Sequence, residues 1–292
     1  MSSARVVVLT SLALIAFAGN SLLCRAALAN THTDAASFTT VRLLSGAVVL
    51  WLLVLIRGGA NTGSGNWLSA LALFAYAAGF SFSYVHLTAA AGALILFGAV
   101  QTTMIGYGIW SGERLHAPQI VGLVLACAGL VGLLLPGLSA PPLFGALLML
   151  SAGFAWGIYS LRGKGAGDPL KVTAGNFARA APVAVVLSVF LSDRAVFDSA
   201  GIGYAFLSGA LASGVGYAIW YAALPALKST TAATVQLGVP VVTALGGVMF
   251  LGEHVTLRLA IATVAIIGGI ALVVLAGKRA GKPDNPLQAP RP

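Results

Sequence analysis

The pentapeptide Ser111-Gly112-Glu113-Arg114-Leu115 separates two long apolar stretches, and Leu251-Gly252-Glu253-His254-Val255 does the same 140 residues later. The apolar segments on either side of the two pentapeptides also correspond. This pattern indicates an internal duplication, which is common in membrane transporters. We expect two repeats, residues 1–139 and 140–277, followed by a disordered cytoplasmic tail rich in proline over residues 278–292.

The composition excludes a soluble protein. Of the 292 residues, 59% are hydrophobic and 8% are charged, whereas a soluble domain carries about a quarter charged residues. Ten apolar segments each approach the ~20 residues that a helix needs to cross the hydrocarbon core, and they lack the alternation of a transmembrane β-barrel. The sequence therefore predicts an all-α polytopic membrane protein with ten transmembrane helices. These segments are Val6–Leu23, Ala35–Ile56, Trp67–Tyr84, Ala89–Trp110, Pro118–Leu135, Leu143–Leu161, Pro169–Leu191, Ile202–Leu224, Thr230–Phe250 and Leu257–Leu275.

The net charge is +9, and the Lys and Arg residues behind it are distributed as expected for a membrane topology. The charge therefore gives no reason to expect a nucleic-acid partner. If the N-terminus is cytoplasmic and the chain crosses ten times, eleven Lys and Arg residues fall at cytoplasmic ends and three at outer ends. Both termini are therefore expected in the cytoplasm. Because five helices per repeat is an odd number, the second repeat is inverted relative to the first, a geometry suited to alternating access.

Ten helices in two five-helix halves resemble the drug/metabolite transporter superfamily in its EamA branch. The Gly-Glu pair before the last helix of each half and the pairs Ala18-Gly19 and Trp156-Gly157 carry the resemblance. Overall, the chain is similar to the YddG-type exporters of aromatic amino acids. The resemblance implies an exporter in the bacterial inner membrane, with a cavity between the first, third and fourth helices and the sixth, eighth and ninth.

Aromatic residues and hydroxyls share one face of the third helix and recur in the eighth. Tyr76 and Phe80 lie well inside the third helix, and Tyr217 and Trp220 lie in the eighth. Aromatic rings with hydroxyls suit a planar, amphipathic solute. The alternative is a belt of aromatic residues at the membrane interface, especially for Trp220 near its helix end. We expect substrate contacts from all four.

Amide side chains within the apolar segments add polar candidates. Gln101 lies near the middle of the fourth helix, and Gln236 lies somewhat off the middle of the ninth. Both amides need hydrogen-bond partners in a dry core, so they bind either the amino or carboxylate end of a solute or a neighbouring helix. Asn20 and Trp156 lie in the paired first and sixth helices. For them the same two alternatives hold, contact with the solute or a bond to a neighbouring helix. Pro240, expected in mid-helix, predicts a hinge.

Arg42 and Arg179 occupy the second helix of each repeat. A charge within the membrane is a candidate for a functional site, and arginine can hold a carboxylate with two hydrogen bonds. Their occurrence in both halves favours the alternative, in which they bind helix carbonyls or extend towards the interface.

Two further patterns predict structural roles. Glu113 and Glu253 precede the last helix of each half, where a carboxylate is stabilised by the free amide groups, so we expect each to cap that helix. The small-residue pairs Ala128/Gly132 and Ala265/Gly269 predict close packing of helices.

The chain lacks the motifs of an enzyme or a metal protein. It has no His-Glu-x-x-His, Cys and His cluster or phosphate-binding loop, so we expect no catalysis, cofactor or metal. A channel would need a continuous polar face on several helices. In this chain the polar residues of the apolar segments are scattered singly, so the sequence argues against a channel. The expected function is export of small amphipathic metabolites, above all aromatic and other neutral amino acids, by a monomer in the lipid bilayer. The alternative is another solute class, namely a nucleobase, a drug-like compound or a phosphorylated sugar.

Overall fold

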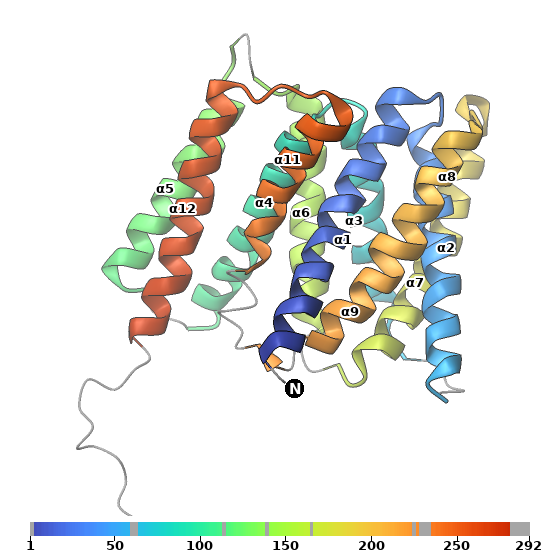
Figure 1. Cartoon of the computed structure of the whole chain (residues 1–292), viewed down its shortest axis with the longest axis horizontal. Coiled ribbons are helices and arrows are strands. Elements are labelled where there is room, and N and C mark those ends of the chain that lie inside the picture. Colours follow the sequence, from blue (N-terminus) through green and yellow to red (C-terminus); the bar gives the residue numbers. More distant parts are fainter. Residues whose placement is uncertain are drawn as a thin grey trace, which may run out of the picture.

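The computed structural model describes residues 3–58, 64–112, 115–137, 140–163, 166–223, 226–227 and 235–280. Across these ranges the chain forms helices and no strand, which confirms the predicted all-α class (Figure 1). The main helices are α1 (Ser3–Asn30), α2 (Ala35–Ile56), α3 (Trp67–Tyr84), α4 (Ala89–Trp110), α5 (Ala117–Leu134), α6 (Leu143–Gly163), α7 (Pro169–Phe190), α8 (Ser199–Leu207), α9 (Gly216–Ala223), α11 (Gly238–Leu251) and α12 (Leu257–Ala280). A short 3-10 helix η1 (Ser192–Arg194) and a π-helix η2 (Ser208–Val215) complete the description.

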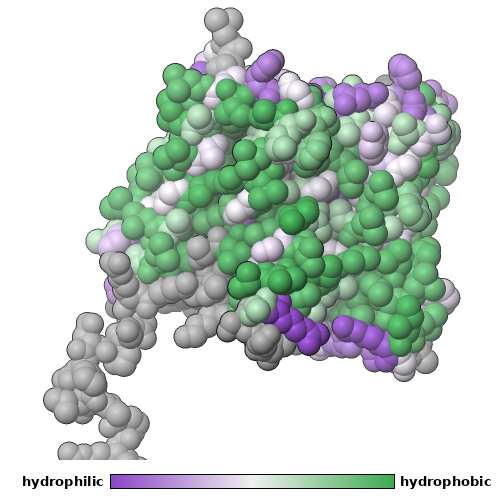
Figure 2. All heavy atoms as spheres, in the orientation of Figure 1, coloured by the Kyte–Doolittle hydropathy of each residue, from purple (hydrophilic) through white to green (hydrophobic). Residues whose placement is uncertain are grey.

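Among the described residues, nine helices are long and apolar enough to cross a membrane. One of them is the continuous segment Ser199–Trp220, which joins α8, η2 and α9. The shorter α11 lies in the remaining predicted segment, so each of the ten segments contains a helix. Apolar residues cover the middle of the face in Figure 2, and hydrophilic side chains gather at its two ends. This distribution fits a lipid-embedded multi-pass protein.

Side-chain caps fix where several helices begin. Asp34 accepts hydrogen bonds from the amides of the first turn of α2, and Asn66 does the same for α3. Thr88, Asp168 and Asp198 cap α4, α7 and α8. These residues satisfy amide groups that have no partner within the helix. The starts of α2, α3, α4 and α7 therefore coincide with the predicted ones.

The glycine of each repeated pentapeptide ends a helix in a left-handed conformation. The φ angle is +93° at Gly112 and +64° at Gly252, a region that favours glycine. After Gly252, the amide of Glu253 bonds back to the carbonyl of Gly247 at 3.0 Å. The two copies of the motif thus share one local function, the termination of α4 and α11. Glu113 lies outside the described residues.

Helix pairing links the first five segments to the second five. The α5 helix lies beside α12, and α2 lies beside α7. The α3 helix packs on α6, while the α8–η2–α9 segment packs on α1; likewise α4 packs on α6, and α11 on α1. The start of α1 and the end of α12 lie at the same end of the bundle (Figure 1). The core is therefore built between elements of the two predicted repeats.

Small residues bring α5 and α12 close together, but not those predicted on α5. A Cβ atom added to Gly122 would lie 2.5 Å from the carbonyl oxygen of Gly269, and one added to Gly129 would lie 2.7 Å from the Cβ of Ala265. The predicted residue Ala128 is exposed and Gly132 has open space around it. The prediction was right for α12 and wrong for α5, because both faces of α5 carry small residues in a helical pattern.

Candidate functional site

A cavity lies between helices of both predicted repeats, in the middle of the bundle. It is lined from α1, α3, α4, α6, the α8–η2–α9 segment and the segment before α11, so all six predicted helices contribute. Its volume is about 20 Å³, room for on the order of one water molecule. The lining residues are Phe17, Asn20, Ser21, Tyr76, Phe80, Leu96, Phe97, Trp156, Ala212, Tyr217 and Gln236.

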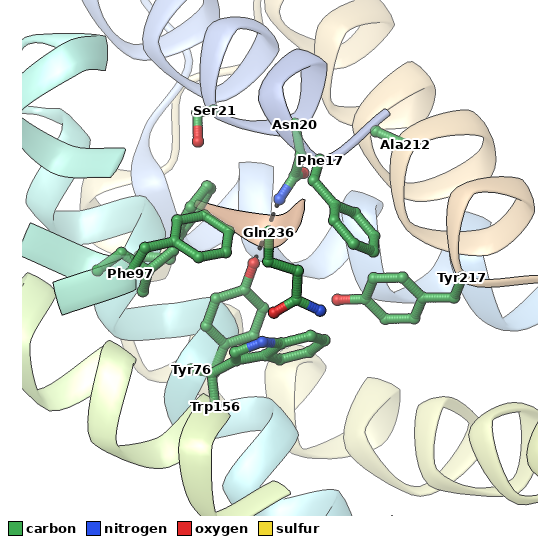
Figure 3. Close-up of a pocket in the computed structure, with 11 residues that line it drawn as sticks. Phe17, Asn20, Ser21, Tyr76, Phe97, Trp156, Ala212, Tyr217 and Gln236 are labelled. Carbon is green, nitrogen blue, oxygen red and sulfur yellow. Dashed lines mark hydrogen bonds between the residues drawn. The ribbon is translucent and has the colours of Figure 1, made fainter. Parts of the chain in front are cut away.

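Aromatic rings form a continuous wall of this cavity (Figure 3). The ring centroids of Tyr76 and Trp156 are 4.7 Å apart, and those of Trp156 and Tyr217 are 5.3 Å apart. Phe80 lies 5.4 Å from Tyr76, and Phe17 meets Tyr217 edge-on at 5.8 Å. These separations are typical of favourable aromatic pairs. The wall therefore offers ring faces and edges to a planar apolar group.

Polar atoms face the same space. The Asn20 amide nitrogen donates to the Tyr76 hydroxyl at 3.3 Å, and the Ser208 hydroxyl donates to the Asn20 carbonyl oxygen at 2.6 Å. The Gln236 side chain extends among Tyr76, Trp156 and Tyr217 in Figure 3. A few placed polar groups within an apolar lining are typical of small-molecule sites.

Arg42 of α2 lies directly behind this wall. Only 1% of its surface is exposed. Its guanidinium carbon lies 4.8 Å from the Phe80 ring centroid and 5.2 Å from that of Tyr76, within the range of cation–π attraction. Its Nη2 also donates to the Tyr76 hydroxyl at 3.1 Å. The arginine is thus coupled to two residues that line the cavity.

The cavity contains six of the eight predicted substrate residues, namely Asn20, Tyr76, Phe80, Trp156, Tyr217 and Gln236. Trp220 is 7% exposed and packs edge-on against Phe17 at 5.9 Å, so it supports a lining residue without lining the cavity itself. Gln101 is 2% exposed, lies outside the lining, and its amide nitrogen has no partner among the described residues.

Sequence reasoning missed other residues of the lining. Phe17 lies about one turn before Asn20 on α1, and Ser21, next to Asn20, lies one turn after Phe17, so helical spacing could have indicated both. Leu96, Phe97 and Ala212 carry no comparable signal, because apolar residues fill every face of their segments.

The structure separates Arg179 from Arg42 and places Pro240 near the start of α11. Arg179 Nη1 donates to the carbonyls of Ser64 at 3.1 Å and Gly175 at 2.9 Å, as expected for an arginine that binds backbone. Pro240 was expected in mid-helix, which is wrong: α11 begins at Gly238, so Pro240 lies in its first turn. A missing amide hydrogen there removes no helical hydrogen bond, and the hinge remains a prediction.

A polar cluster closes one end of the bundle over the cavity helices. Glu253 accepts hydrogen bonds from the Ala89 amide at 3.0 and 2.8 Å and pairs with Arg25 Nε at 3.1 Å. Arg25 Nη1 donates to the Tyr84 carbonyl at 2.9 Å. Glu253 was expected to cap α12 and instead caps α4, because the αL turn at Gly252 directs it across the bundle. The cluster ties together the ends of α1, α3, α4 and α11.

A second cavity, of about 190 Å³, lies at the same end of the bundle and includes His86, Thr88, His254 and Thr256 in its lining. It is larger than the aromatic cavity, but it carries no aromatic wall other than the imidazoles and does not reach α1 or Trp156. We therefore take the smaller central cavity as the candidate site.

Known proteins match this chain in sequence and in fold. The model of the EamA-like transporter family matches residues 143–275. An uncharacterized protein of Pseudomonas aeruginosa is 55% identical over 275 residues, which are 94% of this chain and 96% of that protein. An uncharacterized transporter of Archaeoglobus fulgidus is 26% identical over 277 residues, 90% of this chain and 95% of the relative.

A solved crystal structure matches with a TM-score of 0.69 at 19% identity, covering 95% of this chain and 100% of that one, and supports the fold alone. The family match over residues 143–275 and the transporter relative along nearly the whole chain agree with a bundle of membrane-spanning helices. The chain belongs to the EamA-like transporter family of the drug/metabolite transporter superfamily.

Proposed function

We propose that this protein exports small amphipathic metabolites, above all aromatic and other neutral amino acids, across the bacterial inner membrane by alternating access. The observation that carries the proposal is the aromatic cavity between α1, α3, α4, α6, α9 and the segment before α11. Rings stack on a planar side chain, and the Asn20 and Gln236 amides can satisfy the polar end of an amino acid. No covalent chemistry is needed.

The small volume of the cavity supports a gated mechanism. A space of about 20 Å³ does not admit an amino acid, so the cavity helices must move apart for a solute to enter. Motion of one repeat against the other around a fixed site is the usual mode of transport in inverted-repeat proteins. The Arg25–Glu253 pair joins α1 to the end of α11 and would open when the site faces that end.

The orientation and oligomeric state belong to the same proposal. The charge bias favours cytoplasmic termini, which puts the Arg25–Glu253 cluster on the external side. Reporter fusions after Lys278 and at Ala140 should then report opposite sides of the membrane, and a shared side would contradict ten crossings. The proposed functional unit is the monomer.

Counterflow in proteoliposomes tests the proposed function. Vesicles loaded with unlabelled L-phenylalanine, L-leucine, uracil or glucose 6-phosphate are diluted into the matching labelled solute. We expect exchange of the amino acids, fastest for the aromatic one, and none in protein-free vesicles. Exchange confined to uracil or to the sugar phosphate would replace the proposed solute class with that one.

A further inference from the structure

Arg42 is a buried cation that pairs with no acidic side chain among the described residues. Its Nη2 and Nε atoms donate to the hydroxyls of Tyr76 at 3.1 Å and Ser213 at 3.4 Å, while its Nη1 has no hydrogen-bond partner among the described residues. The ion pair found in the described part of the chain joins Arg25 to Glu253 and leaves Arg42 out. Burying an unpaired charge is strongly unfavourable. The arrangement therefore lacks an anion.

The local fold holds Arg42 in this position. The π-helix η2 approaches α2 so closely that a Cβ atom added to Gly209 would lie 2.1 Å from the Arg42 carbonyl oxygen. The same π-helix supplies Ser213 to Arg42 and Ser208 to Asn20. π-Helical turns are rare and are often found at functional sites. Here the π-helix positions polar contacts for residues on two neighbouring helices.

The Tyr76 hydroxyl connects Arg42 to the cavity. Its oxygen accepts from Arg42 Nη2 at 3.1 Å and from the Asn20 amide nitrogen at 3.3 Å, while the Asn20 carbonyl oxygen accepts from the Ser208 hydroxyl. With two donors on the oxygen, the hydroxyl hydrogen is available to donate, and it donates no hydrogen bond to a described residue. An O–H group whose oxygen accepts from a cation is a strengthened donor.

We propose that Arg42, Tyr76 and Asn20 form a carboxylate subsite on one wall of the aromatic cavity. The Tyr76 hydroxyl donates to the carboxylate of the solute, and Arg42 supplies the counter-charge from behind the Tyr76 and Phe80 rings. The solute is then an aromatic monocarboxylate whose ring stacks on the remaining wall. This inference rests on the proposed transport function and names the group by which the solute is recognised.

The test compares 3-phenylpropionate with its neutral isostere 3-phenylpropionamide, as ligands of the full-length protein in lipid nanodiscs. We expect the wild type to bind the carboxylate at least about tenfold more tightly, as for a hydrogen bond to a charged group. Arg42→Gln and Tyr76→Phe should bring the ratio of the two affinities close to one, because each change weakens binding of the charged carboxylate more than binding of the neutral amide. Arg179→Gln removes the arginine of the matching helix in the second predicted repeat and should keep the preference. In the wild type, the preference should vanish as the pH falls through the pKa of the ligand itself, which a packing role of Arg42 would not produce.

Each result decides between the two proposals. Equal binding of both ligands, or of neither, by the wild type overturns the carboxylate subsite, even where counterflow of amino acids is observed. A preference that survives in Tyr76→Phe, which keeps the ring and the fold, also overturns it and serves if Arg42→Gln fails to fold. A carboxylate preference in a protein that exchanges no amino acid supports the subsite and refutes the proposed amino-acid function.

Discussion

The charge on Glu253 should hold one end of the transporter closed. The substitution Glu253→Gln keeps the size of the side chain and an oxygen that can accept from the Ala89 amide. It removes the ion pair with Arg25 at 3.1 Å and the charge assistance of the two bonds to Ala89. The side chains of Arg25 and Glu253 are only 21% and 11% exposed, so solvent screens the pair weakly. We expect a loss of about 1–2 kcal/mol.

This loss predicts the change in population. A difference of one or two kcal/mol alters an equilibrium about 5- to 30-fold, so the fraction of molecules open at this end should rise by that factor. Opening would expose Cys24, which is fully buried, directly precedes Arg25 and stands three residues from the lining residue Ser21. In a Cys127→Ser background, the labelling rate of Cys24 by a membrane-impermeant maleimide then reports opening.

The matched control lies at the opposite end of the bundle. Arg162 donates to Ser69 at 3.1 Å and Asn66 at 3.1 Å, joining the end of α6 to the start of α3. Arg162→Gln should not raise labelling from the external side. An unchanged Cys24 rate in Glu253→Gln, or an equal rise in both variants, would refute the assignment of the Arg25–Glu253 cluster as a gate.

Three further predictions concern the cavity, the driving force and a helix cap. Tyr76→Ala, Phe80→Ala and Tyr217→Ala should each reduce aromatic transport several-fold at normal expression, since an aromatic pair contributes about 0.5–1.5 kcal/mol beyond burial; unchanged transport in all three would leave these rings a packing role. Because the membrane-spanning helices contain no Asp or Glu, flux should persist without a proton or sodium gradient, and accumulation driven by an imposed pH gradient would contradict a facilitator. At Asp34, burial acts to raise the carboxyl pKa, but hydrogen bonds from Ser37, Val196 and Ala36 outweigh it and the pKa falls below 3.8. The charge therefore stabilises the fold above about pH 4, so the difference in Tm between wild type and Asp34→Asn should be constant at neutral pH and shrink as the pH falls through the lowered pKa; a difference independent of pH would show that the charge adds nothing.

Segment length and capping made the fold readable from the sequence. The predicted bounds Ala35–Ile56, Trp67–Tyr84 and Ala89–Trp110 match α2, α3 and α4, because polar caps and loops interrupt the apolar residues there. The first helix was predicted to stop at Leu23 but continues to Asn30. Arg25 lies in that last stretch, where its contacts with Glu253 and the Tyr84 carbonyl satisfy a charge that hydropathy counts against a helix.

The site was readable only where one face of a helix carries an unusual set of residues. The stripe of Tyr76 and Phe80 follows helical spacing, and its position on the cavity wall follows from that pattern. The different surroundings of Arg42 and Arg179 do not follow from any sequence pattern, because the two arginines occupy matching helices and only tertiary contacts distinguish them. The π-helix η2 was also unpredicted, because the extra residue in its turns leaves no mark in an apolar sequence.

Photoaffinity labelling can locate the bound solute directly. The protein in nanodiscs is irradiated with a diazirine analogue of L-phenylalanine, and the labelled residues are mapped by peptide mass spectrometry. If the solute binds in the central cavity, labels should appear on the peptides that contain Phe17–Ser21, Tyr76–Phe80, Trp156 and Tyr217, and unlabelled L-phenylalanine should suppress them. Labels confined to the second cavity around His86 and His254, or to the outer faces of α5 and α12, would contradict the assignment of the aromatic cavity as the substrate site.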